Sequence, residues 1–110
     1  MIFDMRTYLL KPGWMKEHMA LYEEYGRPPQ VKHLGEPLFY GITETGQVNS
    51  YVHIWAYHSA GDRETKRGAL FSDQDWLDYM RKSRDLGALI QQDNRIMTPA
   101  QFYESPVKPR

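Results

Sequence analysis

The sequence predicts an α+β fold in which four strands and three helices follow the order βαββααβ. Three observations support it. Residues 2–10 and 48–58 alternate as half-buried strands do, and the stretches after Trp14 and Trp76 repeat apolar residues at helical spacing. A short turn between residues 37–45 and 48–58 fits a β-hairpin. At 110 residues, the chain has the length of one domain.

The first strand spans residues 2–10, and its alternation places Asp4, Arg6 and Tyr8 on one face. Pro12 and Gly13 end it. A helix follows from Trp14, because apolar and aromatic residues recur at helical spacing: Met15, His18, Met19, Tyr22 and Tyr25. We expect this helix to stop or kink at the segment Gly26-Arg27-Pro28-Pro29, since proline lacks the amide hydrogen that helical bonding needs.

The segment 48–58 is the clearest strand, because β-branched and aromatic residues fill it. Ser59 and Asp62 then fit a capping box and predict a helix over 62–71. A similar pattern at residues 72–75 predicts a further helix to about Leu89, and residues 94–102 predict a last strand. We expect the helices to pack on the sheet through Trp76, Tyr79, Met80, Met15, Met19 and Tyr22.

This order of elements fits a ferredoxin-like split βαβ sandwich over residues 1–102, with strand order 4-1-3-2 and the helices on one face. The other face would expose aromatic and aliphatic side chains, so we expect a homodimer in which a second subunit covers it. Residues 103–110 form a C-terminal tail that we expect to be loose or to act as a dimer arm.

Charge and composition exclude several function classes. The chain has 14 Lys plus Arg and 14 Asp plus Glu, which argues against nucleic-acid and membrane-surface binding. It has no cysteine, no apolar run that could insert into a membrane and no signal peptide at its start, so we expect a cytoplasmic protein. We expect no metal and no nucleotide cofactor, because the four histidines lack zinc-site spacing and no glycine-rich phosphate loop occurs.

The best candidate site combines polar side chains from the two central strands. Arg6 and His53 are expected on neighbouring strands, with His53 as a general base and Arg6 holding a carboxylate or enolate. The ligand would be a small anionic or aromatic molecule. An alternative is a polar network at the dimer interface. The remaining candidate ligand-binding residues are Asp4, Tyr8, Tyr40, Glu44, Trp55, Arg67 and Asn94.

Arg63 and Arg67 lie four residues apart in the second predicted helix, and therefore on one face of it. Such a pair can clamp a carboxylate or a phosphate group. The commoner arrangement is a solvated face on which these arginines pair with Glu64 and other nearby acids. We therefore expect the solvated, acid-paired face rather than the clamp.

Three ordered blocks, MIFDMRTYLLKPG, YVHIWAYHSAGDRETKRGAL and DNRIMTPAQF, resemble the NIPSNAP family over about residues 1–102. The resemblance implies the dimeric α/β barrel fold, in which two ferredoxin-like subunits bring their sheets face to face. Asp4 departs from the family pattern, which more often has Glu there. The matching positions are Arg6, Thr7, Tyr8, Pro12, Gly13, His53, Trp55, Tyr57, Asp62, Arg63, Arg67, Asn94, Ile96 and Pro99.

The family is poorly defined biochemically, so two functions stay open. One is a homodimeric small-molecule-binding protein, or a cofactor-free enzyme like the monooxygenases, isomerases and polyketide cyclases among related dimeric α/β barrels. The other is a non-catalytic interaction or structural module, whose aromatic faces serve dimerisation only. An open cavity beside His53, Arg6 or Trp55 would distinguish the first function from the second.

Overall fold

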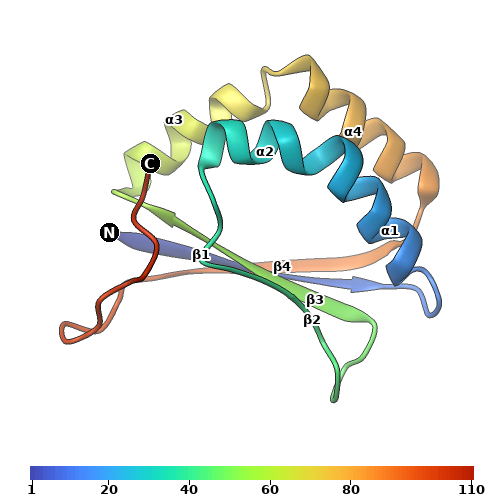
Figure 1. Cartoon of the computed structure of the whole chain (residues 1–110), viewed down its shortest axis with the longest axis horizontal. Helices are drawn as coiled ribbons and strands as arrows, with labels where there is room; N and C mark the ends of the chain where they lie inside the picture. Colours follow the sequence, from blue (N-terminus) through green and yellow to red (C-terminus); the bar gives the residue numbers. More distant parts are fainter.

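The computed structural model describes all residues, 1–110, and has its helices packed on one face of an antiparallel sheet (Figure 1). The predicted order βαββααβ and the predicted strand order are both confirmed, since the sheet runs β2-β3-β1-β4. The elements are β1 (Ile2–Leu10), α1 (Met15–Leu21), η1 (Tyr22–Gly26), α2 (Arg27–Leu34), β2 (Phe39–Ile42), β3 (Ser50–Tyr57), α3 (Ala60–Leu70), α4 (Gln74–Leu86) and β4 (Leu89–Met97).

Strand pairing sets which side chains share a face. Asp4 lies opposite Trp55, and Arg6 lies opposite His53 on β3. On the other side of β1, Arg6 lies opposite Asn94 of β4. Because paired residues in antiparallel strands point to the same side, these side chains all project toward the helices.

The first helix does not stop at the Gly-Arg-Pro-Pro segment. It passes through the π-helical turn η1 and continues as α2. Pro28 lacks an amide hydrogen, and a wider turn just before it tolerates the missing bond. Gly26 also lets the ring of Tyr79 approach the backbone closely, because a Cβ atom built there would lie 2.9 Å from that ring.

The two later helices begin at side-chain caps. Ser59 accepts a hydrogen bond from the amide of Asp62 at 3.1 Å and starts α3, as predicted. The cap of α4 is Asp73, one residue later than the predicted cap, because its carboxylate accepts the amide hydrogen of Asp75 at 2.9 Å.

The end of α4 and the last strand differ from the prediction. Gly87 adopts a left-handed conformation with φ 71° and ends the helix at Leu86. Glycine favours this conformation at helix C-termini because it has no Cβ atom. The chain therefore enters β4 at Leu89, and the predicted strand 94–102 was placed several residues too late.

The core lies between the helices and the sheet. Three of the predicted core residues, Trp76, Tyr79 and Tyr22, are buried there together. Met15 and Met19 are half-buried against a smaller cluster. Met80 is 38% exposed, so its predicted place in the core is wrong. The main buried cluster consists of Tyr22, Leu34, Trp55, Tyr57, Leu70, Trp76 and Tyr79.

No helix covers the opposite face of the sheet (Figure 1). Phe39 is 54% exposed, and Met5, Val52 and Ile54 are half-buried. At one end the ring of Tyr103 packs edge-on against Phe3, with ring centroids 6.3 Å apart. Most of this face is apolar and open.

The C-terminal tail returns to the helical layer. Arg110 donates hydrogen bonds to the carbonyls of Val31 and Lys32, and its own carbonyl accepts one from Lys66. The tail is thus bonded to α2 and α3, and its role as a dimer arm stays a prediction. None of the helices combines the length and apolar character needed to cross a bilayer.

Candidate functional site

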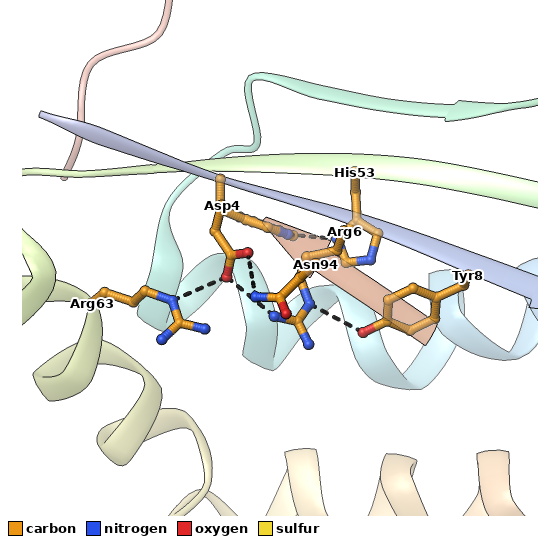
Figure 2. A network of polar contacts seen from close by, with 7 residues as sticks. Asp4, Arg6, Tyr8, His53, Arg63 and Asn94 are labelled. Carbon is orange, nitrogen blue, oxygen red and sulfur yellow. Dashed lines mark hydrogen bonds and ion pairs between the residues drawn. The ribbon is translucent and has the colours of Figure 1, made fainter. Parts of the chain in front are cut away.

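A buried carboxylate organises one end of the helix-covered face (Figure 2). Asp4 is fully buried. Its Oδ2 atom accepts hydrogen bonds from Arg6 at 3.1 Å and from Arg63 at 3.0 Å, and its Oδ1 atom accepts one from Asn94 at 3.0 Å. Three separate elements, β1, α3 and β4, therefore meet at this carboxylate.

The network around Asp4 keeps it ionised. Burial alone would raise the pKa of Asp4, but the Asn94 hydrogen bond and the charges of Arg6 and Arg63 outweigh burial and lower that pKa. The solvated face expected for Arg63 is therefore wrong, because its partner is the buried Asp4 and not Glu64. Arg6 also donates from Nε to the hydroxyl of Tyr8 at 3.2 Å.

Next to this network, His53 is held in one tautomer. The indole N–H of Trp55 lies 2.6 Å from Nδ1 of His53. An indole nitrogen only donates, so Nδ1 must accept and the proton of the neutral ring sits on Nε2. Nε2 is buried and has no hydrogen-bond partner in the protein.

Burial and the nearby charge of Arg6 lower the pKa of His53 to about 3. The ring is therefore neutral near pH 7 and far too weakly basic to accept a proton efficiently. Its geometry favours a hydrogen-bond donor at Nε2 over the general base expected from the sequence.

Aromatic rings surround His53. Tyr40 stacks on it with ring centroids 4.7 Å apart, and Tyr22 stacks on Tyr40 at 5.0 Å. Burial raises the pKa of Tyr40 and of Tyr51, so both hydroxyls stay protonated. His18, which the sequence places on the apolar stripe of its helix, is hydrogen-bonded to the Tyr51 hydroxyl at 2.8 Å.

A cavity of about 390 Å³ opens beside these rings, between the sheet and the helical segments α1, η1, α2 and α4. Trp76 forms part of its wall, and the indole N–H of Trp76 is buried without a partner. The lining residues are Tyr8, His18, Tyr22, Gln30, Tyr40, Tyr51, His53, Trp76, Tyr79, Met80, Ser83, Arg84, Gly87, Leu89 and Gln92.

The structure brings together most of the side chains singled out from the sequence. Three of them, Tyr8, Tyr40 and His53, line the cavity. Asp4, Arg6, Trp55 and Asn94 lie on the same face of the sheet, behind or beside the cavity wall. This face is covered by helices, so the polar network does not lie between two open sheet faces as the interface alternative requires.

Two candidates lie apart from the cavity. Glu44 is exposed in the loop after β2 and contacts none of the network. Arg67 lies on α3, half-buried, one turn after Arg63. No group of three or more His, Cys, Asp or Glu side chains is arranged to hold a metal ion.

Sequence reasoning missed the part of the wall that comes from the helices. Trp76 and Tyr79 were assigned to the core, and the periodicity of α4 cannot distinguish a core contact from a cavity wall. The polar residues Gln30 and Ser83 carry no motif that would have identified them.

The comparisons with known proteins agree with this architecture. The chain is 39% identical to a NIPSNAP family protein from Agrobacterium tumefaciens, with a TM-score of 0.87 over 96% of this chain and 93% of that one. It is 31% identical to a NIPSNAP-like domain protein from Burkholderia xenovorans, with a TM-score of 0.88 over 98% and 91% of the two chains. An antibiotic biosynthesis monooxygenase, 12% identical with a TM-score of 0.63 over 91% of this chain and 99% of that one, shares the fold alone.

Curated relatives are longer proteins. Human NipSnap homolog 3A is 28% identical over 67% of this chain and 30% of its own length. The Drosophila melanogaster protein NipSnap is 28% identical over 94% of this chain and 37% of its own length. The chain thus spans about a third of the curated relatives it matches. The NIPSNAP family model matches residues 3–104, and the chain belongs to the NIPSNAP family.

Proposed function

We propose that the protein binds a small, flat molecule in the cavity beside His53, and that an oxygen atom of this molecule accepts a hydrogen bond from His53 Nε2. The observation that carries this proposal is the unpaired N–H of His53 at the wall of a cavity of about 390 Å³. A buried donor without an acceptor costs about 1–3 kcal/mol, so a ligand oxygen placed there recovers that free energy.

The walls of the cavity support a planar ligand. Tyr22, Tyr40 and His53 form a stack whose neighbouring planes differ by 21° and 17°. Flat aromatic molecules pack well against such rings. The indole N–H of Trp76 supplies a second unpaired donor at the wall. The cavity favours a binding protein over a module that only dimerises.

We also propose that the protein acts as a homodimer with the two open sheet faces in contact. The support is the apolar character of that face, where Phe39 is 54% exposed beside the half-buried Val52 and Ile54. The fold, shared with dimeric α/β barrel proteins, points the same way. Light scattering at micromolar concentration should give the mass of two chains, and a stable monomer would contradict this assembly.

The cavity proposal can be tested with a matched pair of probes. Coumarin is planar and carries a carbonyl oxygen, whereas naphthalene has a similar shape without one. Coumarin should bind the protein more tightly than naphthalene, measured by fluorescence titration, by about 10-fold for one neutral hydrogen bond. The substitution His53→Phe should remove this preference while the cavity still admits both molecules.

The control is His58→Phe, since His58 is exposed at the end of β3 and lies outside the cavity. The His58→Phe protein should prefer coumarin over naphthalene to the same extent as the unmodified protein. In parallel, the purified protein should be denatured and any released small molecule identified by mass spectrometry. Equal binding of coumarin and naphthalene to the unmodified protein would contradict the donor role of His53.

A further inference from the structure

The end of the helix-covered face beneath α3 carries more positive than negative charge. Two guanidinium groups, from Arg6 and Arg63, pair with the single carboxylate of Asp4, and a third, from Arg67, lies one turn after Arg63 on α3. Both oxygens of Asp4 are already occupied by Arg6, Arg63 and Asn94. The neighbouring Asp62 is engaged as well, because it pairs with Lys66 at 3.1 Å and accepts the backbone amide hydrogen of His58.

Arg67 is the cation in this arrangement that has no carboxylate partner. It is half-buried on α3, and no carboxylate pairs with it. Its guanidinium carbon lies 5.3 Å from the ring centroid of Phe71, a cation–π contact that orients the group. Burial and the charge of Arg6 lower the pKa of Arg67, so the positive charge is poorly compensated where it lies.

A second unpartnered group lies close to Arg67. The hydroxyl of Tyr57 is fully buried and makes no hydrogen bond. Burial raises the pKa of Tyr57, and the charge of Arg67 is the largest effect that opposes this rise. Tyr57 also lies on the sheet face that carries Asp4, so Arg67 and the Tyr57 hydroxyl share one neighbourhood. The hydroxyl oxygen can accept from Arg67, and its own O–H still lacks an acceptor.

We propose that Arg67, together with Arg6 and the Tyr57 hydroxyl, binds the oxyanion of a small molecule, either a carboxylate or a phosphate. The planar guanidinium of arginine presents paired N–H groups that match the two oxygens of such a group. Arg6 uses Nε for Tyr8 and Nη1 for Asp4, which leaves Nη2 available. An oxyanion here compensates the excess charge.

This site does not depend on the cavity proposal, although the two are neighbours. Arg6 lies directly opposite His53 in the sheet, and the Tyr8 hydroxyl that Arg6 holds belongs to the cavity wall. An anion can bind at Arg67 with the cavity empty.

The experiment uses inorganic phosphate and acetate as probes, with sodium chloride at equal ionic strength as the reference. Isothermal titration calorimetry of the full chain should detect binding of at least one of the two oxyanions beyond any effect of chloride. Stronger binding of phosphate would point to a phosphorylated ligand, and stronger binding of acetate to a carboxylic acid.

The substitution Arg67→Gln should weaken that binding by about 10-fold to 100-fold, the range expected for a lost hydrogen bond to a charged group. The matched control is Arg81→Gln. Arg81 is exposed on α4 and pairs with Asp78, so its substitution removes the same charge outside the Asp4 network. Arg67→Lys keeps the positive charge but lacks the paired N–H groups of the guanidinium, so it should bind with intermediate affinity. This variant provides the test if Arg67→Gln folds poorly.

Three results would overturn the proposal: neither oxyanion binds better than chloride, Arg67→Gln binds as tightly as the unmodified protein, or Arg81→Gln loses as much affinity as Arg67→Gln. Phosphate or acetate binding that survives in His53→Phe, where the preference for coumarin is lost, would show that the two sites are separate. A negative coumarin test would therefore contradict only the cavity proposal, and a negative oxyanion test would contradict only the anion-site proposal.

Discussion

At the end of the sheet beneath α3, the buried Asp4 has hydrogen bonds to both carboxylate oxygens from three side chains. At the other end, beneath α1 and α4, His53 and Trp76 each keep a buried N–H without a partner. Both ends use side chains of the same central strands, only a few residues apart.

The difference follows from charge. A buried ion without partners costs several kcal/mol, so Asp4 needs a complete set of donors for the chain to fold. A neutral N–H costs about 1–3 kcal/mol when unpaired, which a folded protein can tolerate. The carboxylate of Asp4 is thus satisfied by its own contacts, whereas the neutral donors His53 and Trp76 at the other end stay unpaired and can be used by a ligand.

The largest effect is expected from breaking the charged end. Asp4→Asn removes the carboxylate and leaves Arg6 and Arg63 without their anion, so the free energy of unfolding should fall by about 3–5 kcal/mol. Chemical denaturation measures this loss. The control Asp78→Asn breaks an exposed pair with Arg81 and should cost less than about 1 kcal/mol. Similar losses in both variants would contradict the central role of Asp4.

The neutral end should respond to acid. The pKa of His53 is about 3 in the folded protein, against 6.5 for the free side chain. Between these two pH values the unfolded chain therefore binds more protons than the folded one. The free energy of unfolding should therefore fall as pH drops below 6.5, by about 1.4 kcal/mol per pH unit for this one group. Burial also lowers the pKa of His18, which adds to the slope.

His53→Gln should flatten this slope, leaving the part due to His18. Denaturation near neutral pH and at about pH 5 measures the slope in both proteins. Asp4 does not affect this window, because its pKa is lowered from 3.8 and its stabilisation is lost only at lower pH. An unchanged slope in His53→Gln would mean that the ring is not buried in its neutral form.

The smallest effect is expected where the two ends join. Tyr8→Phe removes the hydroxyl that accepts a hydrogen bond from Arg6 and keeps the ring at the cavity wall. The free energy of unfolding should fall by about 1 kcal/mol, the usual value for one hydrogen bond. Tyr103→Phe is the control, because Tyr103 is 44% exposed, and it should have no measurable effect. A loss as large as that of Asp4→Asn would mean that the two ends form a single network.

Much of the candidate site could be predicted because strand alternation is a local property. A period of two residues places Asp4, Arg6 and Tyr8 on one face wherever the strand lies, and the topology then brings them beside His53. The cap at Ser59 was predictable for the same reason, since it needs only a short stretch of chain. Glu44 was misplaced because β2 ends at Ile42, before reaching it.

The amino-acid sequence by itself determined the order of the elements, the order of the strands and the side chains that share each strand face, because these depend on periodicity and on short turns. Only the tertiary structure decided that the helices cover the face with Asp4 and His53, that Arg63 crosses from α3 to Asp4, and that Trp55 fixes the proton of His53 on Nε2. Those contacts depend on how separate elements pack in space, and no local pattern of residues encodes that packing.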